Sequence, residues 1–354
     1  MLLSVAVVVP ARSKSHSTVC VQRYEPSMAS PKLVFVDVDA DDRALVQSRF
    51  PDALVCEHLD EASLIAQAAD AQVLSVFIQT PVQKSLLDAL PKLRLVCTRS
   101  VGFDHLDLAA CKERQIITFN VPDYGSHVIA EHVFALLLST LRHVGEGNDR
   151  VEGGHFDYHG LRGIALRGKT MGIAGTGKIG RRVAQIAHGF GMNILAYDVC
   201  RNTDLEDLLG VRYVSREALL EQSDIVTLHL PDIPETHHII NKDAFAHMKP
   251  GMILVNTARG GLIDSAALLT ALNTGTLTYA LLDVLEHEQN FAENKALVSH
   301  PNVVTTPHVA FYADDSMRNM YLDCFDSIDQ WIAGKTPDHV VRPQPIVCDI
   351  APSR

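Results

Sequence analysis

The sequence has little of what marks several large classes of protein. It has no stripe of Lys and Arg with interleaved aromatic residues, and 31 Lys and Arg against 42 Asp and Glu give a formal net charge of −11. Nucleic-acid phosphates are met by clustered cations, so we expect no nucleic-acid partner. No run approaches the ~20 uninterrupted apolar residues that a membrane helix needs, so we expect no membrane span.

Cysteine and histidine also fail to form recognisable disulfide or metal patterns. The seven cysteines are scattered, odd in number and without a CxxC pair. This favours reduced thiols in a cytoplasmic setting over a disulfide framework or a zinc site. His155 and His159 lie in "HFDYH", which lacks the glutamate of an HExxH motif, and the neighbours His237 and His238 would point apart. We therefore expect no metal.

The first 30 residues stand apart from the rest of the chain. They begin with a short apolar run that no basic residue precedes, which argues against a secretory signal. Their serines, and the absence of an acidic residue before Glu25, leave organelle targeting by residues 1–27 open. A disordered extension, with Met28 as an alternative start, is the favoured interpretation, and it leaves the protein cytoplasmic.

From residue 32 the chain alternates short apolar runs with helix-period segments, which predicts an α/β fold with a mainly parallel sheet. A length of 354 residues suggests two domains. A long buried helix is expected over 126–144, capped by Ser126, and the Gly-rich polar segment 146–163 is interpreted as a connecting loop. The expected strands are 32–40, 71–78, 93–100, "TMGIA", "NILAYD", 224–230, 252–258, 277–284 and 302–306.

The strongest local signal is the glycine-rich turn "GTGKIG". It follows the strand "TMGIA" and opens a helix, which is the context that a dinucleotide-binding turn requires. Gly175, Gly177 and Gly180 allow a tight turn and the close approach of a pyrophosphate, which the free N–H groups at the helix start bind. Asp198 ends the next strand, where a carboxylate accepts from the ribose 2′-OH of NAD and repels the 2′-phosphate of NADP. Arg201 nearby could soften that preference.

Arg259, Glu288 and His308 each follow a later apolar strand. Ligands of open α/β sheets bind outside the carboxyl ends of the strands, so these three side chains can converge. Arginine binds a carboxylate and polarises the adjacent carbonyl, and histidine, which titrates near pH ~6.5, exchanges a proton with the alkoxide. A carboxylate behind the histidine orients it. Each residue alone is as readily a surface charge or a packed histidine, but their joint placement predicts hydride transfer from NADH to a 2-oxo acid.

Six ordered motifs carry a resemblance to a known family. They are "RSVGFDHLDL", "NVPDYGSHVIAEHVFALLL", "GIAGTGKIG", "VNTARGGLID", "LLDVLEHE" and "TPHVAFY". Together they resemble the D-isomer-specific 2-hydroxyacid dehydrogenases, and "NVPDY" and "HVAFY" most resemble the D-lactate dehydrogenase branch. The resemblance implies two Rossmann-like, doubly wound parallel-sheet domains, with an NAD domain (126–308) inserted into a substrate domain made of 31–125 and 309–354. It also implies a homodimer, formed largely through the helix that begins at Ser126.

The same resemblance assigns roles at matching positions. Arg259 resembles the arginine that binds the carboxylate and polarises the carbonyl, His308 the acid/base, and Glu288, rather than Glu286, its partner. The matching substrate-binding positions are Ser100, Val101, Gly102 and Tyr124. The matching cofactor positions are Gly175, Gly177, Lys178, Ile179, Gly180, Asp198, His229, Thr257, Ala258 and Asp283, the last of which holds the nicotinamide carboxamide. His229 is equally well a packed strand histidine, and Phe311 and Tyr312 are either core aromatics or one of them lines the substrate site.

Two departures from the family pattern concern the loop before His308. Gln289 follows Glu288 where many members have proline, and the interval from Glu288 to His308 is short for the lactate branch. We expect the pair pyruvate and D-lactate, because Arg99 is the only cation in the segments beside the substrate and a phosphate would want several. Reduction of glyoxylate or hydroxypyruvate is the close alternative. A non-enzymatic NAD-sensing protein, similar to the corepressors that share this fold, is the alternative from another class.

Overall fold

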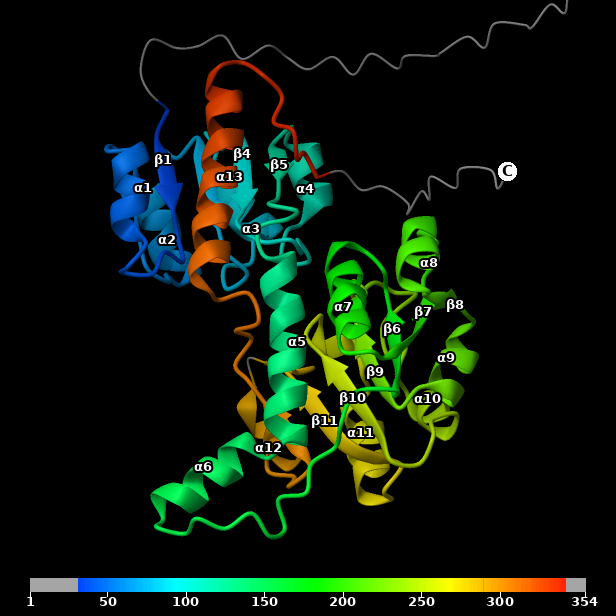
Figure 1. The fold of residues 1–354 in the computed structure, drawn as a ribbon. Helices are drawn as coiled ribbons and strands as arrows, with labels where there is room; N and C mark the ends of the chain where they lie inside the picture. Colours follow the sequence, from blue (N-terminus) through cyan, green and yellow to red (C-terminus); the bar gives the residue numbers. More distant parts are fainter. Residues whose placement is uncertain (1–30, 289, 342–354) are drawn as a thin grey trace, which may run out of the picture.

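The computed structural model describes residues 31–288 and 290–341 and contains two parallel sheets (Figure 1). The expectations for residues 1–30, for Gln289 and for residues 342–354 lie outside this part of the chain. The first sheet has five strands in the order β2-β1-β3-β4-β5, and the second has seven in the order β12-β11-β10-β9-β6-β7-β8. Both orders reverse direction at an inner strand, as in doubly wound nucleotide-binding sheets. The predicted fold class is confirmed.

The five-stranded sheet is covered on both faces by helices. Its strands are β1 (Leu33–Phe35), β2 (Leu54–Val55), β3 (Val73–Val76), β4 (Leu95–Thr98) and β5 (Ile117–Phe119). Its helices are α1 (Arg43–Arg49), α2 (Glu61–Ala68), α3 (Lys84–Ala89), α4 (Leu108–Glu113) and α13 (Asp314–Ile332). Buried side chains of α1 and α13 form one core with the sheet, and those of α2, α3 and α4 form another. This unit therefore combines segments from both ends of the described chain.

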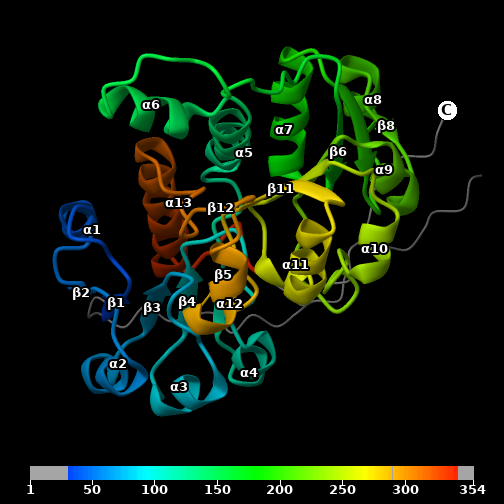
Figure 2. The same ribbon diagram turned by 90° about the horizontal axis from the view of Figure 1, so that it is seen from below.

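The seven-stranded sheet is the larger unit. Its strands are β6 (Thr170–Ala174), β7 (Asn193–Tyr197), β8 (Arg212–Tyr213), β9 (Ile225–Leu228), β10 (Met252–Asn256), β11 (Leu277–Leu282) and β12 (Val303–Thr305). One face packs on α5 (Ser126–Leu141), α7 (Lys178–Gly189) and α8 (Thr203–Leu209). The other packs on α9 (Arg216–Gln222), α10 (Lys242–Ala246), α11 (Ser265–Asn273) and α12 (Phe291–Val298) (Figure 2).

The strands of this sheet show why residues that alternate in sequence serve two cores. In β10 the side chain of Leu254 belongs to one core, and its neighbours Ile253 and Val255 belong to the other. Successive side chains of a strand point to opposite faces, so a strand buried on both sides is apolar throughout. All five residues of β10 are buried. The continuous apolar runs that predicted these strands are thus a consequence of burial on two faces.

Two local predictions are wrong. The segment interpreted as a loop contains most of helix α6 (Val144–Glu152), which buries no residue and whose mostly polar sequence with two glycines has the composition of a loop. Pairs one turn apart, Arg150 with Glu146 and Asn148 with Glu152, support it instead. Ser126 is the first residue of α5 rather than its cap, because its hydroxyl donates to Asp123 at 2.7 Å and leaves the helix amides alone.

The described cysteines and helices bear on the expected compartment and partners. Cys56, Cys97, Cys111 and Cys324 are free and buried, as expected, whereas Cys200 is disulfide-bonded, which departs from the expectation of reduced thiols. Within residues 31–288 and 290–341 no single helix is long and apolar enough to cross a membrane. Only α5 and α6 taken together across a 54° bend reach that length and composition. The same residues contain no cluster of His, Cys, Asp and Glu that could hold a metal ion.

Candidate active site

The predicted catalytic residues lie along one edge of the seven-stranded sheet. Strands β10, β11 and β12 are neighbours, and Arg259, Glu288 and His308 follow them in that order. Parallel neighbours end at the same edge, so residues far apart in sequence are brought together there. The predicted convergence therefore has a simple topological basis.

His308 and Glu288 are in direct contact. The His308 Nδ1 lies 3.1 Å from the Glu288 Oε2, and the two side chains are 25% and 38% exposed. Glu286 points elsewhere, since its carboxylate contacts His238 Nε2 at 2.6 Å and accepts from the Ser265 amide at 3.1 Å. The structure therefore pairs His308 with Glu288 and not with Glu286, and the short interval between them does not prevent the contact.

The backbone of His308 is held in an unusual conformation. Its φ of 54° lies in the left-handed region, which non-glycine residues rarely adopt, so surrounding contacts must stabilise it. Asp283 supplies them: its carbonyl accepts from the His308 amide at 2.8 Å, and its carboxylate accepts from the amides of Val309 and Ala310, both at 2.9 Å. The residue expected to hold the nicotinamide carboxamide thus braces the loop that carries the acid/base histidine.

Asp283 itself is buried and needs partners of its own. Thr306 donates to its Oδ1 at 2.5 Å, and His132 of helix α5 lies 3.5 Å from the same oxygen. Burial alone would raise the pKa of Asp283, but the hydrogen bonds from His132, Thr306 and the loop amides hold it below the ordinary value. His132 was missed by the sequence analysis, because nothing in the helix pattern distinguishes it from a packed residue.

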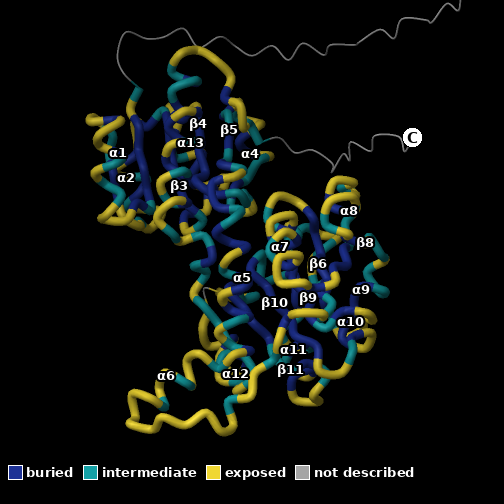
Figure 3. Tube along the Cα trace, in the orientation of Figure 1, coloured by how far each residue is buried: buried dark blue, intermediate teal, exposed yellow. Residues whose placement is uncertain are grey.

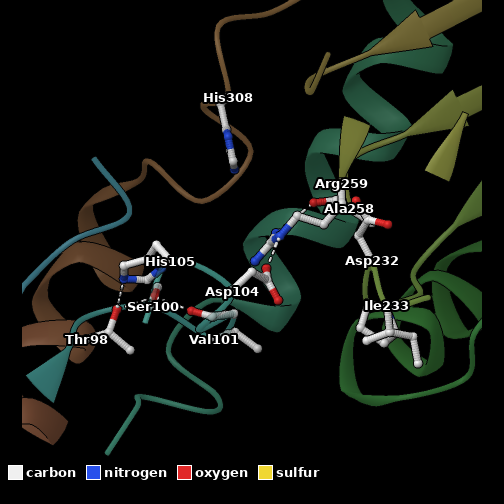
Figure 4. A network of polar contacts seen from close by, with 12 residues as sticks. Thr98, Ser100, Val101, Asp104, His105, Asp232, Ile233, Ala258, Arg259 and His308 are labelled. Carbon is white, nitrogen blue, oxygen red and sulfur yellow. Dashed lines mark hydrogen bonds and ion pairs between the residues drawn. The ribbon is translucent and has the colours of Figure 1, made fainter. Parts of the chain in front are cut away.

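Arg259 reaches from the seven-stranded unit toward the loop after β4. Its Nε donates to Asp104 at 2.8 Å and its Nη1 to the carbonyl of Ala258 at 2.7 Å. Its Nη2 lies beside Gly102, where a Cβ would approach to 1.6 Å. Figure 4 shows the His308 ring pointing toward the space between Arg259 and this loop. The guanidinium and the histidine therefore face a common space at the junction of the two units.

The loop itself offers amide donors. Thr98 and Ser100 share a hydrogen bond at 2.6 Å, and the Ser100 hydroxyl donates to the Gly102 carbonyl at 2.6 Å. Within the described residues, the N–H groups of Val101 and Gly102 donate to no protein acceptor. Free amides beside an arginine are the kind of donors that can bind a carboxylate. Ser100 therefore serves to shape the loop, and Val101 and Gly102 are its available donors.

Aromatic residues form an apolar wall next to His308. The Phe311 ring centroid lies 6.2 Å from that of His308 and 5.0 Å from that of Phe77, which follows β3. Tyr312 is 51% exposed, and its hydroxyl donates to Asp39 at 3.0 Å. Phe311 and not Tyr312 is thus the aromatic beside the histidine. Tyr124 is buried, and burial raises the pKa of its phenol, although Arg259 nearby opposes that rise.

The glycine-rich turn has the shape that a pyrophosphate needs. Gly175 has a φ of +94°, and a Cβ there would meet the His229 carbonyl oxygen at 2.4 Å. A Cβ at Gly180 would meet the Gly175 carbonyl oxygen at 2.0 Å, while the space beside Gly177 is open. Lys178 and Ile179 begin α7, so their amides lack helical acceptors and face the same turn. The glycines therefore fit their predicted role.

Further residues on this edge have unused polar groups. The hydroxyl of Thr257 and the Nδ1 of His229 are buried without a partner among the described residues, and burial lowers the pKa of His229 to about 3. Buried polar groups without a partner call for a ligand, and His229 and Thr257 follow β9 and β10, beside the glycine turn. Asp198 follows the neighbouring strand β7, where its carboxylate is held by the Thr176 amide at 2.5 Å and the Cys200 amide at 2.8 Å. The set fits a dinucleotide.

Two arginines near the predicted site are engaged by other groups of the protein. Arg201 lies over the Tyr213 ring at 5.5 Å and forms an ion pair with Glu206. Glu206 therefore neutralises the positive charge that Arg201 brings to the neighbourhood of Asp198. Arg99 is fully buried in the five-stranded unit, where it donates to Ser75 and to the carbonyls of Val36 and Asp37. Arg99 therefore cannot serve the substrate.

Comparisons with known proteins agree with this geometry. The family model for the D-isomer specific 2-hydroxyacid dehydrogenase NAD binding domain matches residues 134–310. A 2-hydroxyacid dehydrogenase homolog of Haemophilus influenzae is 35% identical over 79% of this chain and 89% of its own length. The chain belongs to the D-isomer-specific 2-hydroxyacid dehydrogenases. NAD is accordingly the cofactor of this dehydrogenase, and the glycine turn with its neighbours is the place that would hold it.

Two further comparisons mark the range within the family. A glyoxylate reductase of Aeropyrum pernix is 36% identical over 79% of this chain and 85% of its own length. The D-lactate dehydrogenase of Aquifex aeolicus, solved with NAD and lactic acid, has a TM-score of 0.78 and 33% identity over 86% of this chain and 96% of its own. The chain is thus an oxidoreductase of 2-hydroxy or 2-oxo acids.

Proposed function

We propose that this dehydrogenase reversibly reduces pyruvate to D-lactate with NADH. The observation that carries the proposal is the contact of His308 with Glu288 at 3.1 Å beside the guanidinium of Arg259 and the free amides of the loop after β4. An acid/base pair and an anion site at one edge of a dinucleotide-binding sheet are what the reduction of a 2-oxo acid requires.

The residues divide the work of the reaction between them. The amides of Val101 and Gly102 and the Nη2 of Arg259 bind the carboxylate of the substrate and polarise its 2-oxo group. His308 donates a proton to the carbonyl oxygen as the alkoxide forms and takes it back in the reverse direction. Glu288 holds Nδ1 of the ring, which leaves Nε2 to face the substrate, and stabilises the protonated ring. NADH supplies the hydride when bound.

The size and charge of the site favour a short, uncharged substituent. The rings of Phe311 and Phe77 form the apolar wall of the site next to His308. Arg99 is buried in the core of the five-stranded unit, so its charge does not reach the site. A methyl group suits an apolar wall, whereas a phosphate would be left without the several cations that it needs. The similarity to D-lactate dehydrogenase structures supports the same choice.

Reduction of glyoxylate or hydroxypyruvate is the second candidate. Relatives with those names match this chain at 36% identity in Aeropyrum pernix and 34% in Thermotoga maritima. The buried Tyr124 favours this candidate on physical grounds, because its phenol lies near Arg259. A phenol next to the substrate would bind the hydroxyl of hydroxypyruvate.

The test is NADH oxidation by the purified protein over pyruvate, glyoxylate, hydroxypyruvate and phosphohydroxypyruvate. We expect the highest kcat/KM with pyruvate, little activity with the phosphorylated acid, and a large loss in Arg259→Ala. A higher kcat/KM with glyoxylate or hydroxypyruvate would select the second candidate. No turnover of any 2-oxo acid, with NADH still bound tightly, would select an NAD-sensing protein instead.

We also propose that the active form is a homodimer. Helix α6 and the segment that follows it project from the body of the molecule as an exposed arm (Figure 3). The arm carries Phe156 and Tyr158, which are 95% and 78% exposed, and no residue of α6 is buried. Large apolar side chains at such exposure mark an interaction surface. Analytical ultracentrifugation should give a mass of twice the 38.8 kDa of one chain. The double variant Phe156→Ser, Tyr158→Ser should give a mass closer to that of a single chain.

A further inference from the structure

Asp104 occupies a position that the roles assigned so far leave unexplained. It is the only ion-pair partner of Arg259 within the described residues, with Nε and Oδ2 2.8 Å apart. Its carboxylate is 48% exposed and borders the space that Arg259 and Gly102 share, since a Cβ at Gly102 would lie 3.4 Å from Asp104 Oδ2. An anion thus stands at the entrance of a site that binds anions.

The contact joins the two units of the molecule. Asp104 belongs to the loop after β4 of the five-stranded sheet, and Arg259 follows β10 of the seven-stranded sheet (Figure 4). The two residues are separated by 155 positions in sequence. The orientation of the guanidinium in one unit is therefore set by a carboxylate of the other.

The loop that carries Asp104 is firmly braced. The His105 Nε2 lies 2.9 Å from the Thr98 hydroxyl, and the His105 carbonyl accepts from the Val82 amide at 2.9 Å. The Asn120 side chain donates to the Val101 carbonyl at 2.7 Å. Burial lowers the pKa of His105 to about 4, so this neighbour is neutral at pH 7 and does not compete with Arg259 for the carboxylate. Asp104 is thus a fixed anion with one cation.

The pair leaves a defined part of the guanidinium free. Nε is engaged by Asp104 and Nη1 by the Ala258 carbonyl, so only Nη2 faces Gly102. Without Asp104 the guanidinium could rotate and present any edge, because an arginine side chain has several rotatable bonds. With it, Nη2 and the amides of Val101 and Gly102 form one set of donors.

We propose that Asp104 is a positioning residue that fixes Arg259 for catalysis at a cost in substrate affinity. The inference rests on the proposed role of Arg259. Its carboxylate orients the guanidinium, which lowers the barrier of the reaction, while its negative charge opposes the carboxylate of the substrate. Removal of the charge therefore has two separable effects: kcat falls because orientation is lost, and KM does not rise because repulsion is lost as well.

The test compares Asp104→Asn, Asp104→Ala and Asp104→Glu with the wild type in steady-state reduction of pyruvate. An amide oxygen still accepts from Nε, so Asp104→Asn should lower kcat by roughly tenfold and Asp104→Ala by roughly 10²-fold, the effect of a misplaced catalytic group. KM should stay unchanged or fall by up to about fivefold in both variants. Asp104→Glu keeps the charge and should retain more of the wild-type kcat than Asp104→Ala does.

Two controls separate this role from a structural one. Asp70→Asn removes an exposed ion pair with Lys92 in the same unit, and it should leave kcat and KM unchanged. The Tm and the NADH affinity of the Asp104 variants should equal those of the wild type, since an exposed pair contributes little to stability. A raised KM together with a lowered Tm in Asp104→Ala would mean that the residue only holds the fold.

The remaining outcomes also decide the matter. Unchanged kcat with a lower KM in Asp104→Asn would show that the pair merely competes with substrate, and it would overturn the inference. The binding of oxamate, an unreactive analogue of pyruvate, to the protein with NADH provides a second measurement. It should be equal or tighter in Asp104→Asn, and weaker binding would also overturn the inference. If the wild type reduces no 2-oxo acid, the proposed function fails; if it does and Asp104→Ala matches it, this inference alone fails.

Discussion

Gly102 should be indispensable for turnover and dispensable for folding. A Cβ at this position would lie 1.6 Å from Arg259 Nη2 and 2.8 Å from its Cζ, far inside ordinary contact distance. The atoms in the way are the far end of a flexible side chain, so the backbone has no reason to move. Gly102 is not among the residues with positive φ, so alanine meets no backbone strain. The substitution Gly102→Ala should therefore displace the guanidinium and little else.

The magnitude follows from the displacement. To restore an ordinary contact of roughly 3.5 Å, the guanidinium must retreat by about 2 Å, and a misplacement of ~1 Å can cost ~10²-fold. We expect kcat/KM for pyruvate to fall by about 10²-fold or more, with the affinity for NADH and the Tm nearly unchanged. The assay is NADH oxidation followed by absorbance, with NADH affinity from fluorescence and Tm from calorimetry.

A matched substitution separates this effect from a general one. Gly189 ends α7, and a Cβ there would meet nothing within 4 Å, so Gly189→Ala should keep wild-type turnover. Near-wild-type kcat/KM in Gly102→Ala would refute the account, because it would mean that Nη2 of Arg259 does not need its place beside Gly102. If Gly102→Ala lowered the Tm by many degrees, the loop after β4 rather than the side chain of Arg259 would have changed its conformation.

Three other substitutions probe the site from different sides. Glu288→Gln removes the charge that stabilises protonated His308, so kcat should fall by roughly 10²-fold or more, and unchanged kcat would contradict the pairing. Asp198→Ala should narrow the preference for NADH over NADPH measured as a ratio of kcat/KM, and an unchanged ratio would mean that another group reads the ribose. His105 stays neutral in the fold down to about pH 4, while the unfolded chain protonates near 6.5. The free energy of unfolding should therefore fall as pH drops through that window, by up to ~1.4 kcal/mol per pH unit, and less steeply in His105→Gln; equal slopes would place the ring in solvent.

The sequence predicted the site well where topology alone brings residues together. Arg259, Glu288 and His308 follow three neighbouring strands, so the position of each at a strand end was enough to place them at one edge. The glycine turn could be predicted equally well, because its spacing and its place between β6 and α7 are local properties of the sequence. Such features need no knowledge of how distant segments pack.

What could not be predicted depends on contacts between distant segments. The pairing of Asp104 with Arg259 and of His132 with Asp283 joins residues that no local pattern relates. Strands β2 and β8 have only two residues each, too few for an alternation to show. Helix α6 has no buried residue and carries two glycines among mostly polar side chains, so its composition is that of a loop.

The central claim is that His308 moves the proton in the reduction of a 2-oxo acid by NADH. The most direct measurement is kcat for pyruvate reduction by His308→Ala against the wild type at saturating NADH, with NADH affinity measured in parallel. The account predicts a loss of roughly 10²–10⁴-fold in kcat with NADH affinity retained. A variant that keeps near-wild-type kcat would contradict it and remove His308 from the mechanism.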